Sequence, residues 1–361
     1  MFKPVFQITP KTAQALMRIE ALKQHLLGLT LNVATRRRLQ ETARLLSTHY
    51  STMIEGNRLT LKEAKEVVKN NQHFPGRERD EQEVLGYYNA LDKIESWVKP
   101  ALKITEIHIQ HLHALVMSRK RTGIKPTPYR DGQNVIRDNK SGGIVYLPPE
   151  AKDVPKLMDE LVAWIEATKK ELPCPIRAGI AHYQFATIHP YFDGNGRTAR
   201  LLTTLILHVG GYDLNGFYSL EEYYGRNLAG YYKALAIGPS HNYYMGRADA
   251  DVSMWIEYFF LGVAEAFENV FTAAKSQRDV KRGAQSLLRK LDARQRRALN
   301  LFQKNEIITA RDIAKLFSLK PRTARLLCQK WVELGFVSIV DPAKKSRKYR
   351  LNEEYEDLIQ E

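Results

Sequence analysis

Apolar residues recur at helical spacing along almost the whole chain. One such run consists of Leu39, Ala43, Leu46, Tyr50 and Met53. Residues three or four positions apart share one face of a helix, so each run predicts an amphipathic helix. The chain is therefore predicted to be mainly α.

Two segments break this periodicity and predict short strands. The apolar residues of the first are Val135, Ile136, Ile144, Val145 and Tyr146. They lie on both sides of the turn-rich stretch 138–143, which predicts a β-hairpin over residues 133–147. The second segment, in which residues 336–340 and 348–351 flank a basic loop, predicts another hairpin.

Composition indicates a globular protein with more than one domain. The chain has 361 residues, of which 44% are hydrophobic and 26% charged, enough for more than one core. We expect an N-terminal helical region at residues 1–100, a central helical domain at 101–275 and a small basic domain at 285–361. No signal peptide or membrane span is recognised, and the cysteines, Cys174 and Cys328, are far apart. We therefore expect a cytoplasmic protein without membrane association.

The segment richest in chemical groups begins at His189. It reads His189-Pro190-Tyr191-Phe192-Asp193-Gly194-Asn195-Gly196-Arg197-Thr198-Ala199-Arg200. Pro190 disfavours helical backbone at His189, so the apolar helix before it should end there. A second apolar helix should start close to Arg197. Because Gly194 and Gly196 allow close backbone approach just before a helix N-terminus, the loop predicts an anion site.

The charged residues of this loop indicate phosphate chemistry. Arg197 and Arg200 lie in the first helical turn, where the helix dipole disfavours cations, so a bound anion is expected. Asp193 is placed to hold a Mg²⁺ that also takes phosphate oxygens. His189 suits removal of a proton from an attacking hydroxyl at neutral pH. Each residue alone has an ordinary structural role, in a cap, a turn or a solvated face, and only their combination favours a nucleotide site.

This segment resembles the signature of Fic-domain proteins, with Tyr191 in place of the usual phenylalanine. The resemblance implies a Fic-type helical bundle that transfers AMP from ATP to a Ser, Thr or Tyr hydroxyl of a target protein or of itself. It implies His189 as base, Asp193 on Mg²⁺, and Arg200 near the γ-phosphate. The α- and β-phosphates would be held by Gly194, Asn195, Gly196 and Arg197. The residues alone leave transfer of phosphocholine, UMP or phosphate open.

Two further segments acquire roles from the same resemblance. The hairpin is similar to the Fic flap, which holds a target segment by strand-like pairing. Its docking residues would be Val135, Ile136, Ile144 and Tyr146. An ordinary surface hairpin is the alternative. Asn227 and Tyr232 stand where the family places residues near the nucleotide, although aromatic residues at this spacing also occur in cores.

An upstream helix end resembles the Fic inhibitory motif. Ser51 and Glu55 precede Gly56, a natural C-terminal cap. A glutamate at this end of the helix dipole gains from a cationic partner, and the motif implies that Glu55 pairs with Arg200. ATP would then bind in an unproductive pose. In this family the same glutamate can also favour AMP removal, and an exposed helix-end glutamate is the alternative.

The C-terminal region carries an uneven positive charge. From Lys281 onward there are 19 Lys and Arg against 10 Asp and Glu. Helices at 294–302, 310–317 and 321–334, followed by the hairpin, resemble a winged helix, with Lys320, Arg322 and Arg325 as candidate DNA contacts. Winged helices also dock proteins. An ATP-sensing DNA-binding regulator is therefore the competing hypothesis, and homodimer formation is left open.

Overall fold

The structure, a computed structural model, describes residues 2–29, 31, 33–99, 102–118, 123–137, 142–238, 240–341 and 347–359. The chain forms two compact units, Met1–Thr272 and Ala273–Glu361. Among the described residues, no helix is both long enough and apolar enough to cross a bilayer.

The first unit is built almost entirely of helices. They are α1 (Pro10–Leu27), α2 (Val33–Ile54), α3 (Leu61–Asn70), α4 (Glu78–Trp97), α5 (Glu106–Val116), α6 (Val154–Ala167), α7 (Cys174–Ile188), α8 (Asn195–Val209), α9 (Leu220–Arg226) and α10 (Leu228–Leu235). The long helix α11 (Ser253–Lys290) begins here and ends in the second unit. Short 3₁₀ turns are η1 (Ala151–Asp153), η2 (Thr168–Lys170), η3 (Leu214–Gly216) and η4 (Tyr243–Met245).

Local sequence signals set several helix boundaries. At α1, the Thr9 hydroxyl accepts a hydrogen bond from the Thr12 N–H, and Pro10 occupies the first turn. At α3, Thr60 and Glu63 form a reciprocal capping box. At α7, Pro190 follows His189, whose backbone takes a left-handed conformation and ends the helix as expected.

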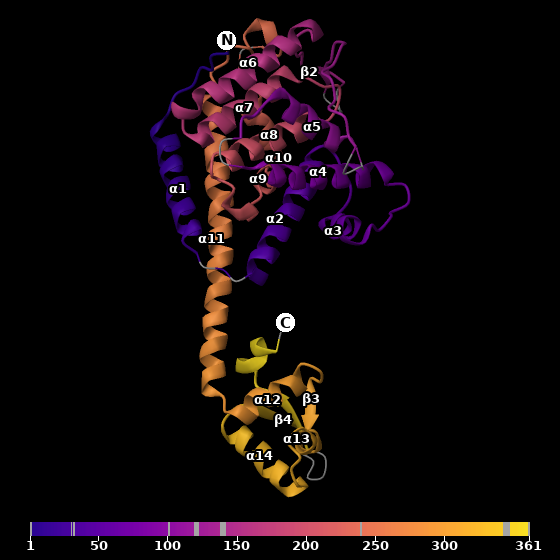
Figure 1. Ribbon diagram of the computed structural model, residues 1–361, viewed down its shortest axis with the longest axis vertical. Coiled ribbons are helices and arrows are strands. Elements are labelled where there is room, and N and C mark those ends of the chain that lie inside the picture. Colours follow the sequence, from indigo (N-terminus) through magenta and orange to yellow (C-terminus); the bar gives the residue numbers. More distant parts are fainter. Residues whose placement is uncertain are drawn as a thin grey trace. The chain divides into compact units, whose positions relative to one another are not determined.

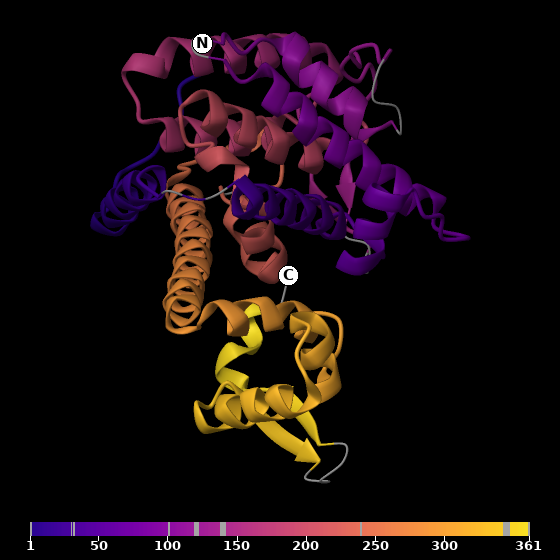
Figure 2. The ribbon, with the colours of Figure 1, turned by 60° about the horizontal axis from the view of Figure 1, so that its bottom comes forward.

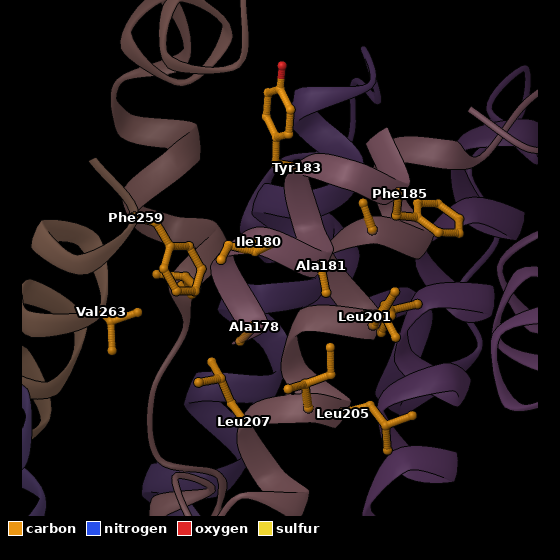
Figure 3. Packing of buried hydrophobic residues seen from close by; sticks show 14 of the residues in the cluster. Ala178, Ile180, Ala181, Tyr183, Phe185, Leu201, Leu205, Leu207, Phe259 and Val263 are labelled. Carbon is orange, nitrogen blue, oxygen red and sulfur yellow. The ribbon is translucent and has the colours of Figure 1, made fainter. Parts of the chain in front are cut away.

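Helix α7 lies at the centre of the first unit. All its residues except Ala186 are buried, and it packs between α6 and α8 (Figure 1). Figure 3 shows side chains of α7, such as Ala178 and Ile180, meeting Leu205 of α8 and Phe259 of α11. The next helices around α8 are α2, α4 and α5. This packing fixes the loop between α7 and α8, which carries the candidate site.

A glycine permits a close contact between α7 and α11. A Cβ at Gly179 of α7 would lie 2.8 Å from Phe259 Cδ1. The Trp255 indole N–H donates to the Gly179 carbonyl at 2.7 Å. Because the glycine has no side chain, α11 can lie directly against α7.

The N-terminal region shares its core with the central region. The buried residues of α1 are Thr12, Ala15, Ile19, Leu22 and Leu26. Its apolar members join the same buried cluster as α7 and α8. The expected division at residue 100 therefore does not separate two cores. The second unit begins at Ala273, upstream of the expected start at 285.

The central hairpin is shorter than the sequence predicts. Strand β1 (Ile136–Arg137) pairs antiparallel with β2 (Ile144–Tyr146). Ile136 lies opposite Tyr146, and the register shifts before Arg137 pairs with Ile144. Val135 precedes β1, and residues 138–141 of the predicted turn lie outside the described residues.

The second unit packs helices against a three-stranded sheet (Figure 2). Its elements are α12 (Ala293–Phe302), β3 (Ile307–Thr309), α13 (Ala310–Phe317), α14 (Pro321–Glu333), β4 (Val337–Asp341), β5 (Lys348–Leu351) and η5 (Glu353–Leu358). The antiparallel sheet has the order β3-β5-β4. Sequence analysis predicted the helices and two of these strands but not β3. The hairpin loop 342–346 lies outside the described residues.

Candidate active site

His189 lies directly after the last turn of α7. Its backbone has φ 52° and ψ 59°, and its N–H donates to the Phe185 carbonyl at 3.0 Å. Ring atom Nδ1 is 3.3 Å from the Ala186 carbonyl oxygen. This contact assigns the proton to Nδ1 and leaves Nε2 as the basic nitrogen. Burial lowers the pKa of His189 to about 4, so the ring is neutral at pH 7.

Arg130 holds this loop from the side of the hairpin. Its Nε donates to the His189 carbonyl at 3.0 Å, and its backbone N–H donates to the Pro190 carbonyl at 2.9 Å. Its Nη1 donates to the Gly132 carbonyl at 3.0 Å. The side chain is buried, so it joins the start of the hairpin to the histidine. Sequence analysis missed Arg130, because a single arginine far from the loop gives no signal.

The side chain of Asn195 shapes the loop. Its Oδ1 accepts from the Tyr191 N–H at 2.9 Å, and its Nδ2 donates to the Tyr191 carbonyl at 2.7 Å. Both ends of the amide are therefore used within the loop. The Tyr191 ring is buried and stacks on His113, with ring centroids 3.6 Å apart. What Asn195 can offer to an anion is its backbone N–H in the first turn of α8.

Both glycines of the loop occupy places where a side chain would not fit. Gly194 has φ 76° and precedes α8. A Cβ there would lie 3.0 Å from Met117 Sδ. A Cβ at Gly196 would collide with the carboxylate of Glu55. The Glu55 carboxylate thus lies directly over the backbone of Gly196, in the space that a side chain would fill.

Asp193 presents a carboxylate at the edge of the site. The residue is exposed. Its Oδ1 accepts from the Gly194 N–H at 2.6 Å and from Arg197 Nη2 at 3.4 Å. Its Oδ2 is 3.8 Å from Arg79 Nη2. In the described part of the chain, no group of three or more His, Cys, Asp or Glu residues forms a metal site. A single carboxylate with a free face fits a Mg²⁺ whose other ligands are phosphate oxygens and water.

Arg197 is buried below Asp193. Its side chain is 2% exposed, with Nη1 3.6 Å from Glu83 and Nη2 3.4 Å from Asp193. Both distances exceed those of a well-formed charged hydrogen bond. Arg197 Nε has no hydrogen-bond partner among the described residues. The guanidinium therefore keeps donor capacity at the N-terminus of α8.

Arg200 is held by the end of α2. Its Nε donates to the Ser51 hydroxyl at 2.8 Å, and its Nη2 donates to the Ser51 carbonyl at 2.9 Å and to Glu55 Oε1 at 2.8 Å. The Arg200 side chain is 1% exposed and that of Glu55 is 29% exposed. Burial alone would lower the pKa of Arg200, but Glu55 raises it above its usual value. The structure thus brings together the two residues that the inhibitory motif pairs.

A buried polar chain that sequence analysis missed lies behind Arg200. The Tyr231 hydroxyl is 2.9 Å from His182 Nε2, and His182 Nδ1 is 2.9 Å from Thr203 Oγ1. Burial raises the pKa of Tyr231 to about 12, and the nearby Arg200 opposes that shift. Tyr231, His182 and Thr203 all lie outside the signature, so only the folded structure brings them close to Arg200.

Asn227 and Tyr232 have structural contacts of their own. The Asn227 side chain caps α10 by accepting from the Gly230 N–H at 3.0 Å. The Tyr232 hydroxyl donates to the Ile54 carbonyl at 3.2 Å, at the end of α2. Tyr232 is 49% exposed, so its ring lies at the surface beside Glu55.

The hairpin residues divide into exposed and anchoring ones. Ile144 is 52% and Val145 43% exposed, whereas Tyr146 is 7% exposed. The Tyr146 hydroxyl donates to the Thr187 carbonyl at 2.7 Å. The Tyr146 side chain therefore fixes the hairpin to α7. Val135 and Ile136 are half-buried.

The loop between α7 and α8 thus offers a base, a carboxylate and an open helix N-terminus, a combination that suits an anion. Residues 103–207 match the model of the Fic/DOC family. The mainly helical, Fic-type fold is confirmed. A Fic family protein from Desulfovibrio desulfuricans has a TM-score of 0.67 at 24% identity, with 98% of this chain and 99% of that chain covered. Fic-1 from C. elegans has a TM-score of 0.59 at 23% identity, over 74% of this chain and 73% of that one.

Curated relatives are similar over about half of this chain. Protein adenylyltransferase Fic of Nematostella vectensis is 32% identical over 181 residues, which cover 49% of this chain and 40% of the relative. The protein of the same name from Drosophila grimshawi is 32% identical over 50% of this chain and 36% of its own length. The chain thus spans less than half the length of these curated relatives.

Proposed function

We propose that this protein transfers AMP from ATP to a hydroxyl side chain of a protein. The observation that carries the proposal is the α7–α8 loop, where His189, Asp193 and the open N-terminus of α8 lie within a few residues of one another. The similarity to proteins named adenylyltransferases supports it.

The chemistry follows from the state of each group. The neutral His189 ring accepts the proton of a Ser, Thr or Tyr hydroxyl through Nε2 as the oxygen attacks the α-phosphorus. The bond from this phosphorus to the bridging oxygen breaks, and pyrophosphate leaves. A Mg²⁺ on Asp193 would supply positive charge to the phosphate oxygens. The first-turn N–H groups of Asn195, Gly196 and Arg197, with the Arg197 guanidinium, would hold the α- and β-phosphates.

Glu55 is proposed to inhibit this reaction in two ways. Its carboxylate accepts from Arg200 Nη2 at 2.8 Å, so this donor is not free for a γ-phosphate. It also occupies the space above Gly196, where a phosphate would approach the helix N-terminus. A carboxylate beside an incoming triphosphate is repulsive as well. ATP is then expected to bind with its phosphates displaced. Removal of AMP from a modified target remains the competing role for Glu55.

The target protein is proposed to dock on the hairpin. Ile144 and Val145 are exposed on the hairpin, which Tyr146 joins to the last turn of α7 before His189. Pairing of the hairpin with an extended segment would place a hydroxyl without strict sequence demands. Cys174 and Cys328 are both free thiols and both buried. Free thiols fit a protein that acts in the reducing cytoplasm.

Transfer of label from ATP tests the proposal. Cell lysate would be incubated with Mg²⁺ and ATP labelled at the α- or the γ-phosphate, together with Glu55→Gly protein or Glu55→Gly/His189→Ala protein. We expect α-label but no γ-label on proteins, and an about 10²- to 10⁴-fold loss when His189 is removed. γ-Label would establish phosphorylation instead. Confirmed ATP binding without any α-label would favour the ATP-sensing regulator.

A further inference from the structure

The second unit has a surface that AMP transfer does not use. Between Arg311 and Lys330 the chain has six basic residues and one acidic residue, Asp312. Four acidic residues lie close together near the end of the unit, at Glu353, Glu354, Glu356 and Asp357. The segment of α13, α14 and the turn between them is therefore strongly basic.

The basic side chains of this stretch are exposed. They are Arg311, Lys315, Lys320, Arg322, Arg325 and Lys330. None of them forms an ion pair with another described residue. The one acid, Asp312, is engaged as a cap, since its Oδ2 accepts from the Thr309 N–H and hydroxyl, each at 2.8 Å. Arg350 on β5, by contrast, pairs with Glu306. Clustered cations without partners repel one another, and a polyanion would relieve that repulsion.

Helix α14 has two sharply different faces. Ala324, Cys328 and Trp331 are buried in the core of the unit. The opposite face carries Arg322, Arg325, Leu326 and Gln329, at the spacing of a single helical stripe. Leu326 is 59% exposed in the middle of this stripe. An exposed apolar side chain on the same face as two arginines offers a contact that a merely solvated helix face does not need.

The turn before α14 leaves its N-terminal half accessible. Helix α13 ends at Phe317, and Ser318 takes a left-handed backbone with φ 52°. Only Ser318, Leu319 and Lys320 separate the two helices, and α13 packs against α14. This is the geometry of a helix-turn-helix pair, in which the second helix is the one offered to a partner. Arg322, Arg325 and Lys330 lie on that second helix. Lys320 directly precedes its N-terminus, which itself attracts phosphate.

We propose that this face of α14 binds in the major groove of double-stranded DNA. Lys320 and Lys330 would contact phosphates at the two ends of the helix. Arg322 and Arg325 are placed for phosphates or guanine edges, Gln329 suits an adenine edge, and Leu326 suits a thymine methyl group. A helix enters the B-form major groove, whereas the major groove of an RNA duplex is too narrow for it. The proposal does not depend on the AMP transfer activity.

Fluorescence anisotropy of labelled DNA with the full-length chain tests this surface. The variant Arg322→Ala/Arg325→Ala is compared with Arg294→Ala/Lys304→Ala, which removes the same charge from two other exposed positions of the unit that form no ion pair with a described residue. Between about 50 and 200 mM KCl, we expect the first variant to bind about tenfold or more weakly, and its salt slope to fall by about 2. We expect the second variant to change little. Equal losses in both variants, or no binding by the native chain at low salt, would overturn the proposal.

Two further arms separate DNA from other polyanions. An RNA duplex of the same sequence should bind more weakly than the DNA. Polyglutamate of equal total charge should fail to displace the DNA. Equal RNA binding would indicate attraction without groove contact, and efficient displacement by polyglutamate would indicate an acidic protein partner. Either result would overturn the assignment. Selection from random duplexes should yield a preferred sequence that shifts with Leu326→Ala/Gln329→Ala. An unchanged preference would contradict the base contacts proposed for Leu326 and Gln329.

Discussion

At the scale of single residues, His189 combines position and protonation state. Its left-handed backbone turns the chain out of α7, while Arg130 fixes its carbonyl at 3.0 Å. Burial keeps the ring neutral by lowering its pKa to about 4. A base that is already neutral is ready to accept a proton at any physiological pH.

The pH dependence of transfer follows from this pKa. For Glu55→Gly protein, we expect kcat/KM to be flat between pH 6 and 8 and to fall only as pH drops toward 4, where His189 becomes protonated. Glu55 raises the pKa of His189, so its removal should shift the acidic limb further down. The measurement is a kcat/KM profile at pH values where circular dichroism shows a folded protein. An apparent pKa near 6.5 would contradict the proposed environment.

The buried hydrogen-bonded side chains Tyr231, His182 and Thr203 near Arg200 give a second prediction. Tyr231→Phe removes the hydroxyl that contacts His182 at 2.9 Å and should cost about 1 kcal/mol of stability. In the Glu55→Gly background we expect a higher KM for ATP, because Arg200 loses part of its support. Tyr224→Phe is the control, since the Tyr224 ring lies next to that of Tyr231, with centroids 4.6 Å apart, and its buried hydroxyl has no partner among the described residues. Equal KM values for the two variants would show that Tyr231 is not a positioning residue.

At the scale of elements, the end of α2 reaches the start of α8. Ser51 and Glu55 both accept from Arg200, and the Tyr232 hydroxyl fixes the Ile54 carbonyl at 3.2 Å. The proposed inhibitory element is thus the last turn of α2, which contacts both Arg200 and Tyr232. Its strength should depend on each of these contacts.

Ser51→Ala tests this dependence. It removes the 2.8 Å hydrogen bond from Arg200 Nε but leaves the pair with Glu55. We expect AMP transfer to rise above the native rate but less than with Glu55→Gly, in an assay with α-labelled ATP. Thr48→Ala, one turn earlier on α2, removes a buried hydroxyl without a partner among the described residues and should leave the rate unchanged. If Ser51→Ala behaved like Thr48→Ala, the serine would contribute nothing to inhibition.

The sequence predicted elements well wherever local chemistry decides them. Pro190 gave the end of α7, and the helices of the second unit were predicted within a residue or two. Strand β3 has only three residues, too few for a periodic signal, and forms because it pairs with β5. The contacts of Arg130 and Tyr231 could not be predicted from the sequence either. They join segments that are distant in the sequence, so only tertiary packing brings them to the site.

At the scale of the whole molecule, each unit has a hydrophobic core of its own. Trp331 is 1% exposed in the core of the second unit. Trp331→Ala should destabilise that unit by about 3 to 5 kcal/mol, as measured by thermal unfolding. AMP transfer in the Glu55→Gly background should persist. Leu326→Ala, on the exposed face of the same helix, should leave stability unchanged. Loss of AMP transfer with Trp331→Ala would show that the site depends on the second core.

The most direct test of the account compares α-label transfer by the native chain, by Glu55→Gly and by Glu55→Gly/Arg200→Ala. Glu55 accepts a hydrogen bond from Arg200 and fills the space above Gly196. Its removal should therefore raise the rate of AMP transfer by about tenfold or more. Further removal of Arg200 should abolish most of that gain, since the γ-phosphate loses its cation. If Glu55→Gly transferred no more label than the native chain while ATP binding was intact, a brake at Arg200 would be contradicted.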